Sequence, residues 1–199
     1  MIDININIPG EKLLMKIWDT IFGSSHIRRE GRARSEVRRE EMLMLTQAES
    51  DVRDIRSGRK HLDQNRNLVL STQGENQLAL PEVGTEGETS TSPPPPTDTP
   101  PFFKSAEREI FLREISRQIN LRKIAILAEE EGESIPDEEV SDDPIDSDWF
   151  TRWRENAQDV SGLDLQRLWA QILAGELKQP GSYSLHTVEF MRRLSKDDA

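Results

Sequence analysis

Apolar residues recur along most of this chain at every third or fourth position, which is the spacing of amphipathic α-helices. The densest pattern lies near the carboxyl end, where one apolar stripe covers residues 165–177 and another covers residues 185–194. Pro180 and Gly181 separate the two stripes and predict a turn. The sequence therefore predicts a helix-turn-helix hairpin in this region.

Capping residues predict where the carboxy-terminal helices begin. Asp146 opens a helix whose acidic first turn suits the helix dipole. Ser161 is the expected N-cap of the next helix, and the carboxylate of Asp164 is expected to accept hydrogen bonds from the free backbone amides of its first turn. Ser182 or Ser184 is expected to cap the last helix.

Three of the four tryptophans, at positions 149, 153 and 169, stand at helical spacing in these segments. We expect them to form the core and not a ligand site, because large aromatic side chains supply much of the burial in a small domain. Gly175 lies inside a helical pattern, where glycine costs about 1 kcal/mol relative to alanine. It predicts the close approach of another backbone.

The longest continuous helical pattern covers residues 105–131 and ends near Gly132. The segment from Glu129 to Asp148 then holds eleven acidic residues and no basic one. Such a run is usually a solvated loop. The alternative is that it faces the arginines of residues 28–39, within the molecule or across an oligomer.

The amino-terminal part predicts a short amphipathic helix over residues 11–22, followed by a longer one over about residues 26–56. The short helix carries an apolar face with the composition of a membrane-interface helix, formed by Leu14, Ile17, Trp18, Ile21 and Phe22. The long helix begins basic and ends with a narrow seam suited to pairing with another helix, formed by Leu45, Ala48, Val52 and Ile55.

Residues 1–9 show a different pattern, because isoleucine alternates with Asp or Asn at positions 2, 4, 6 and 8. This period of two predicts a short extended segment. A lone strand is not stable in water. The segment therefore needs another chain to pair with, or stays loose.

Composition divides the chain into three parts. Residues 71–101 contain seven of the eleven prolines, including the run at positions 93–96, and predict a disordered or polyproline linker. Such a run is more commonly a spacer than a ligand of an SH3-type domain. We expect an all-α protein with a helical region at residues 1–70, a linker at 71–104 and a small helical bundle at 105–199.

Several kinds of chemistry lack their residues. The sequence has no cysteine, which excludes disulfides and thiolate metal sites, and its three histidines are scattered. It has no glycine-rich phosphate loop after a strand and no nucleophile elbow. Glu176 is the one carboxylate in a distinctive setting, and its expected role is that of a surface residue or a cap for the Ser182 turn. We therefore predict no enzyme, no cofactor and no metal.

Four stretches together resemble the bacterial family called domain of unknown function 2806: Gln118-Ile-Asn-Leu, Val140-Ser-Asp-Asp-Pro-Ile-Asp-Ser-Asp-Trp149, Leu168-Trp-Ala-Gln-Ile-Leu-Ala-Gly-Glu and Pro180-Gly-Ser-Tyr-Ser-Leu-His-Thr. The resemblance covers roughly residues 116–199 and, more loosely, the first fifty. The motif positions are Trp169, Leu173, Gly175, Glu176, Pro180, Gly181, Ser182 and Ser184. His186 replaces the arginine that the family pattern has. The resemblance implies an all-helical protein of unassigned activity and supplies no catalytic residues.

A fainter resemblance, limited to the tryptophan-containing helix and the last six residues, is to the Abi-alpha group, which is associated with abortive phage infection. Ser195 to Asp198 reads as a new capping box at the very end of the chain. Because helices do not usually begin there, we expect the native protein to continue past Ala199.

Three functions remain for comparison. The leading hypothesis is a non-enzymatic helical module that binds a protein partner or a second copy, with a role in phage defence as an extension. The alternative is a membrane-surface effector that binds anionic lipid through residues 11–39. Nucleic-acid binding by residues 26–39, with six arginines against two glutamates, is disfavoured because the chain carries a net charge of −11. No signal peptide is evident, so we expect a cytoplasmic protein, peripheral to the inner membrane in the second case.

Overall fold

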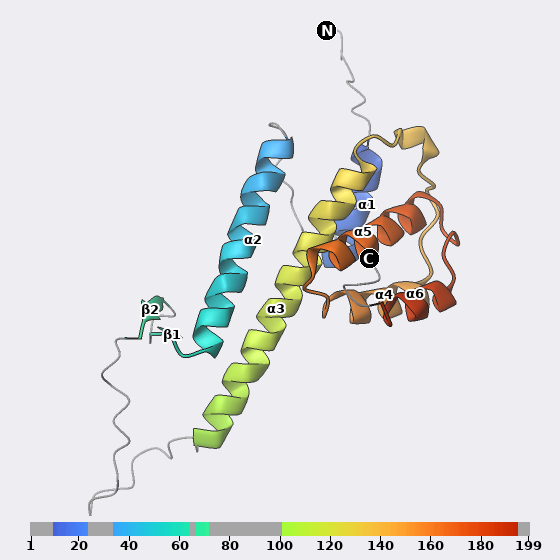
Figure 1. Cartoon of the computed structure of the whole chain (residues 1–199). Coiled ribbons are helices and arrows are strands. Elements are labelled where there is room, and N and C mark those ends of the chain that lie inside the picture. Colours follow the sequence, from blue (N-terminus) through green and yellow to red (C-terminus); the bar gives the residue numbers. More distant parts are fainter. Residues whose placement is uncertain (1–9, 24–33, 64–66, 72–100, 195–199) are drawn as a thin grey trace, which may run out of the picture. The chain divides into compact units, whose positions relative to one another are not determined.

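The computed structural model describes residues 10–23, 34–63, 67–71 and 101–194. These residues form six α-helices, a short 3-10 helix and one antiparallel strand pair (Figure 1). The elements are α1 (Glu11–Phe22), α2 (Arg34–Arg56), β1 (Lys60–Leu62), β2 (Leu68–Leu70), α3 (Pro101–Gly132), η1 (Asp137–Glu139), α4 (Ser147–Ala157), α5 (Leu163–Lys178) and α6 (Leu185–Met191). The prediction of an all-α protein with a long amino-terminal helix and a small carboxy-terminal bundle is confirmed. The small hairpin was not predicted.

Several predictions fall on residues outside this description. They concern the extended segment at residues 1–9, the first part of the basic stretch, the proline-rich run at 93–96 and the capping box at 195–198. The predicted linker is described only at its two ends, where Ser71 follows β2 and residues 101–104 already belong to α3.

The chain divides into two compact units. The first comprises residues 1–49 and 115–199, and the second comprises residues 50–114. The boundaries between the units lie inside α2 and α3, so each of these helices has one part in the first unit and the other part in the second.

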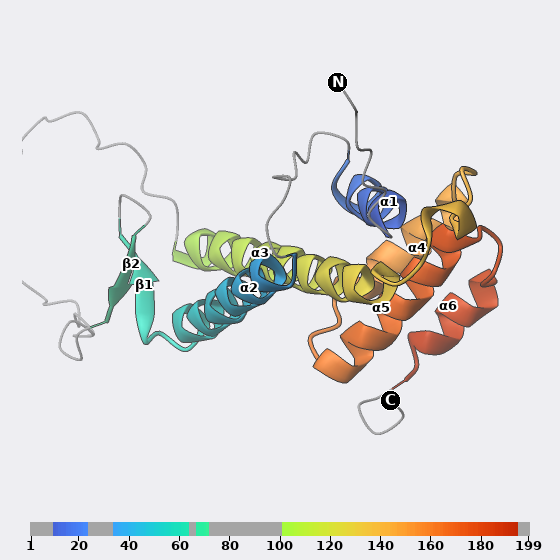
Figure 2. The same ribbon diagram turned by 90° about the horizontal axis from the view of Figure 1, so that it is seen from above.

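Helix α1 is an integral part of the core of the first unit. Its apolar side chains pack with those of the carboxy-terminal half of α3 and of α4, α5 and α6, and α1 and α5 lie side by side (Figure 2). Gly10, just before α1, has φ of +81°, and a Cβ there would lie 2.7 Å from the carbonyl oxygen of Gly132. Only glycine fits both the left-handed backbone and this close approach.

The acidic segment after α3 is fastened to α1 by two lysines. Lys12 Nζ donates to the carbonyl oxygen of Val140 at 2.6 Å and forms an ion pair of 2.7 Å with Asp142. Lys16 Nζ donates to the carbonyl oxygens of Ser141, at 3.0 Å, and Leu177, at 3.1 Å. Burial lowers the pKa of Lys16, and the nearby ammonium of Lys12 lowers it further. Part of the predicted solvated loop is therefore held by specific contacts.

A buried carboxylate joins α1, α2 and α3 in the first unit. Glu129 is 1% exposed and accepts a hydrogen bond from Trp18 Nε1 at 3.2 Å. Arg38 Nη1 lies 3.5 Å from Glu129, while its Nη2 forms an ion pair of 2.7 Å with Glu133. Of the arginines in residues 28–39, Arg38 thus contacts the acidic run within the molecule, as the alternative hypothesis stated. Arg28, Arg29 and Arg32 lie outside the described residues.

In the second unit, the end of α2 packs with the start of α3. Val52, Ile55 and Leu112 are buried, and Arg56 forms an ion pair of 3.3 Å with Glu109. The strand pair follows α2, and Lys60 Nζ of β1 donates to Asp51 of α2 at 2.6 Å.

The predicted helix starts are confirmed in two cases and wrong in one. Asp146 caps α4 by accepting from the amide of Trp149 at 2.7 Å, and Ser184 caps α6 by accepting from Thr187 N at 3.3 Å. Ser161 does not cap α5, because the N-cap is Gly162 and makes no side-chain hydrogen bond.

Among the described residues, no helix has both the length and the apolar character that crossing a membrane requires.

Replacing Arg38 tests the buried carboxylate. We expect Arg38→Ala to lower the free energy of unfolding by about 3–5 kcal/mol, because it removes the guanidinium that lies beside the buried Glu129 carboxylate. Urea unfolding measures the loss. Arg39→Ala is the control, since Arg39 is exposed and its removal should change stability by about 0.5 kcal/mol at most. Equal effects of the two substitutions would show that Glu129 does not need the guanidinium.

The Lys12–Asp142 pair predicts a pH effect. The hydrogen bond and charge of Lys12 hold the pKa of Asp142 below its usual range. A carboxyl group whose pKa is lower in the folded state than in the unfolded state stabilises the folded protein at pH values above its unfolded pKa. This stabilisation is lost as the pH falls through the pKa of the folded state. We expect NMR titration to show the low pKa of Asp142 in the wild type and its return toward the ordinary value in Lys12→Ala. An unchanged Asp142 titration in that variant would contradict the pairing.

Candidate functional site

The turn between α5 and α6 is built by a buried carboxylate. Glu176 is 1% exposed, and its two oxygens accept hydrogen bonds from the backbone amides of Gly181, at 2.7 Å, and Tyr183, at 2.9 Å. Gly181 adopts φ of +87°, a left-handed conformation that glycine takes without strain. Of the two roles predicted for Glu176, the structure shows the cap, in a buried setting. Both of its oxygens are committed to the backbone.

The sequence predicted that Gly175 makes room for a second backbone, but the structure shows that it makes room for an aromatic ring. A Cβ at this position would lie 2.8 Å from Cε2 and 3.0 Å from the hydroxyl oxygen of Tyr183. The prediction of a close approach is therefore confirmed, but its partner is wrong. The ring of Tyr183 covers the last turns of α5 because Glu176 holds the Tyr183 amide.

The remaining motif residues complete this scaffold. Trp169 and Leu173 are buried in the core, and the carbonyl oxygen of Trp169 accepts from Trp153 Nε1 at 3.2 Å. Pro180 follows the end of α5, and Ser182 Oγ donates to the carbonyl oxygen of Gln179 at 2.7 Å. The eight motif positions thus hold the core, the turn and the start of α6 in place.

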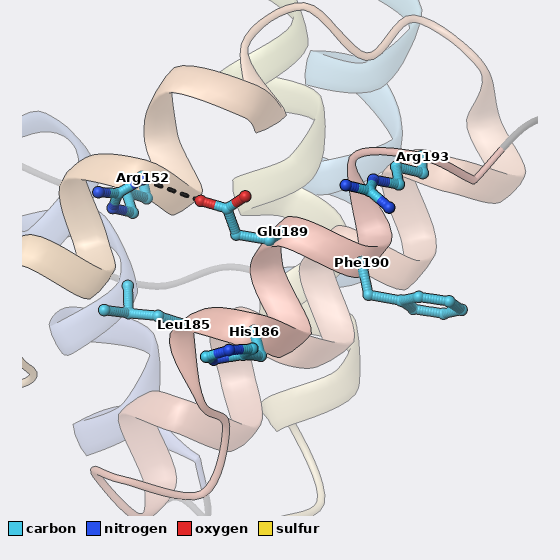
Figure 3. A pocket seen from close by; sticks show the side chains of 6 residues that line it. All are labelled: Arg152, Leu185, His186, Glu189, Phe190 and Arg193. Atoms are coloured by element: carbon cyan, nitrogen blue, oxygen red, sulfur yellow. Dashed lines mark hydrogen bonds and ion pairs between the residues drawn. The ribbon is translucent and has the colours of Figure 1, made fainter.

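The scaffold positions α6 against α4, and a hollow of about 440 Å³ lies on the outer side of this pair (Figure 3). Arg152 of α4 lines it together with four residues of α6, namely Leu185, His186, Glu189 and Phe190, and with Arg193, which follows the helix. The ion pair of 2.9 Å between Arg152 and Glu189 bridges the two helices at one side of it. The inner side of α6, formed by Val188 and Met191, is buried.

The hollow combines apolar surface with positive charge. Phe190 is 65% exposed and Leu185 is 38% exposed, although both are large apolar residues. Arg152 and Arg193 supply two positive charges against the one carboxylate of Glu189. This local excess of cations contrasts with the net charge of −11 of the whole chain.

The predicted helix-pairing seam is largely turned toward the protein itself. In the second unit Val52 and Ile55 are 5% and 7% exposed. In the first unit Leu45 packs against the core, and Ala48 is half-buried. The seam is therefore used, at least in part, by contacts within each unit.

The predicted membrane face is also covered. Leu14, Ile17, Trp18 and Ile21 are buried, and Phe22 stacks on Trp18 with the ring centres 5.3 Å apart. In this state the face packs on protein, and binding to a membrane would require α1 to leave the core.

The titratable residues do not converge on a reaction centre in the described part of the chain. The hollow includes His186, but its lining does not include Glu176. His61 lies in the second unit, 3.3 Å from Ser71 Oγ, and His26 is outside the description. Within the described ranges, no group of three or more His, Asp or Glu side chains has the arrangement of a metal site.

Sequence analysis did not single out Arg152, Glu189, Phe190 or Arg193 as functional residues. A signal was present, because Phe190 lies off the apolar stripe of the last helix and two arginines stand at positions 192 and 193. An aromatic residue outside the buried stripe of an amphipathic helix is expected on the surface.

Comparison with known proteins agrees with the predicted resemblance. Residues 104–199 match the model of a family described as protein of unknown function (DUF2806). No curated protein and no solved structure matches the chain.

A conservative substitution tests the structural role of Glu176. We expect Glu176→Gln to lower the free energy of unfolding by about 2–3 kcal/mol, because the amide removes a charged acceptor and directs a donor at a backbone N–H. Urea unfolding measures this loss. Glu155→Gln on the exposed side of α4 is the matched control, with an expected change of about 0.5 kcal/mol or less. Undiminished stability of Glu176→Gln would show that the turn does not depend on the carboxylate.

Proposed function

We propose that this chain, whose residues 104–199 match the DUF2806 model, is a non-enzymatic helical interaction module. Its partner is a protein with an acidic segment that carries an apolar side chain, and the α4–α6 hollow binds this segment. The observation that carries the proposal is the exposed ring of Phe190, 65% accessible, in a lining that also contains Arg152 and Arg193.

The apolar part of the hollow supports protein binding. Aromatic residues and arginines are the side chains most often found at the energetic centre of protein–protein interfaces. Phe190 and Leu185 would gain burial from an apolar side chain of the partner, at about 25 cal/mol for each Å² removed from water. Since Val188 and Met191 fix the inner side of α6 in the core, the outer face is presented on a rigid element.

The charges of the hollow support an acidic partner. Arg152 lies on α4 and Arg193 lies two residues after the end of α6, so that a bound carboxylate-rich segment would contact both sides of the hollow. The guanidinium group suits carboxylates because it presents several donors in a plane. Such rim charges mainly steer association and make it sensitive to salt.

The non-enzymatic part of the proposal is supported by the role of Glu176. This carboxylate was the one in a distinctive setting by sequence, and both of its oxygens accept backbone hydrogen bonds. The role in phage defence and the binding of lipid stay predictions; the burial of the apolar face of α1 favours the interaction module over the membrane effector.

Paired substitutions on two exposed surfaces test the proposal. Phe190→Asp introduces a carboxylate in the lining of the hollow, whereas Leu163→Asp introduces the same group at an exposed position of α5 outside it. Proteins that associate with the full chain are identified by quantitative cross-linking, and the purified partner is titrated against each variant. We expect Phe190→Asp to weaken binding by about tenfold or more and Leu163→Asp to leave it unchanged.

Ionic strength provides a second measurement with the same partner. The affinity of the wild type should fall as salt is added, and Arg193→Ala should reduce this dependence. A partner that binds Phe190→Asp as tightly as the wild type, or whose binding is insensitive to salt, would contradict the proposed site.

A further inference from the structure

The strand pair of the second unit has an open edge. The register pairs Lys60 with Leu70, His61 with Val69 and Leu62 with Leu68. In the flanking pairs, Asp63 N donates to Asn67 O at 3.0 Å and Ser71 N donates to Arg59 O at 2.9 Å. Hydrogen-bonded and non-hydrogen-bonded pairs alternate in an antiparallel ladder, so His61 and Val69 form a hydrogen-bonded pair, whereas the pairs Lys60–Leu70 and Leu62–Leu68 are not hydrogen-bonded. The amides and carbonyls of Leu68 and Leu70 therefore point away from β1.

Among the described residues, this outer edge of β2 has none of the usual protection against further pairing. Proteins blunt exposed edges with charged side chains, prolines or bulges. Strand β2 consists of Leu68, Val69 and Leu70, which are 46%, 39% and 71% exposed. Strand β1 differs, since Lys60 lies on it and is tied to Asp51 and Asp54 of α2. The accepting edge is thus that of β2.

The side chains beside the open edge are apolar on one face. In a strand, alternate residues point to the same side, so Leu68 and Leu70 share a face with Leu62 of β1. All three leucines are at least 38% exposed. A third strand with apolar residues at every second position would extend both the hydrogen bonds and this apolar face.

The sequence contains one segment of that kind without an assigned partner. Isoleucines at positions 2, 4, 6 and 8 alternate with Asp3, Asn5 and Asn7, directly before Pro9. The seven residues reach about 23 Å when extended, more than the roughly 10 Å of β2. In a register that places the isoleucines beside Leu68 and Leu70, the polar residues lie on the other face, with His61 and Val69.

We propose that residues 2–8 of a second copy of this chain add to the outer edge of β2 as a third strand. Each copy carries one such segment and one open edge, so two copies satisfy each other around a two-fold axis. This exchange forms two strand additions for a single loss of translational freedom. Pairing of one isolated segment would have to meet that cost alone.

The inference does not depend on the proposed function of the α4–α6 hollow. It is tested on the full chain by sedimentation equilibrium over a wide range of concentration. We expect a monomer–dimer equilibrium for the wild type. Ile6→Asp places a charge on the apolar face of the segment, and Asn5→Asp adds the same charge on its polar face. The first should raise the dimer dissociation constant by about tenfold or more, and the second should leave it unchanged.

Proline substitutions test the edge. Leu70→Pro removes an amide that points away from β1, and an edge strand tolerates such a change. It should abolish the dimer while leaving the β1–β2 ladder in place. Leu62→Pro removes an outward amide on the opposite edge and should leave the dimer intact. Circular dichroism and tryptophan fluorescence establish that each variant folds.

Three results would overturn the inference. The first is a wild type that stays monomeric at every concentration. If the Ile4 and Ile6 amides of that monomer are nevertheless protected from hydrogen exchange, the segment pairs within its own chain. The second is equal dimerisation of Ile6→Asp and Asn5→Asp. The third is loss of the dimer in Leu70→Pro but not in Ile6→Asp, which would make β2 of the second copy the occupant.

Discussion

The burial of the apolar face of α1 is the interaction on which the first unit depends. Leu13, Ile17 and Ile21 are at most 2% exposed, and each side chain of this kind contributes about 1.5–3 kcal/mol when it leaves water. A helix of twelve residues is too short to persist alone in water. Residues near the start of the chain therefore complete a core whose other helices come from its second half. Burial of the apolar face also fixes the orientation of α1. Lys12 and Lys16 are thereby directed at the acidic segment and hold it by hydrogen bonds and an ion pair.

Carboxylates serve as structural connectors in this protein. Glu129 joins Trp18 and Arg38, and Glu176 joins two amides of the α5–α6 turn. A buried carboxylate without such partners would be costly. In the stretches that resemble the DUF2806 pattern, Gly175, Tyr183 and Glu176 fix the path from α5 to α6. This scaffold supports the outer side of α6, where Phe190 is exposed, and Arg193 follows the end of the helix.

The helices and their ends were largely predictable, since they depend on local patterns. The stripe at 165–177 and the caps at Asp146 and Ser184 need only neighbouring residues. Ser161 was wrong because Gly162 took the N-cap position one residue later. The hairpin at 60–70 was missed, as its strands of three residues are too short to show a period of two. The hollow was not predicted either, because Arg152 and Phe190 are far apart in the sequence.

The sequence alone determined that this protein is helical, because apolar spacing and capping act over one or two turns of chain. It also determined which carboxylate was unusual, since Glu176 follows a glycine in the middle of an apolar pattern. Only the tertiary structure decided what these features face. The same amphipathic helix at residues 11–22 suits a membrane or a protein core, and periodicity cannot distinguish the two. The choice rests on contacts between residues more than a hundred positions apart, such as Trp18 with Glu129 and Lys16 with Leu177.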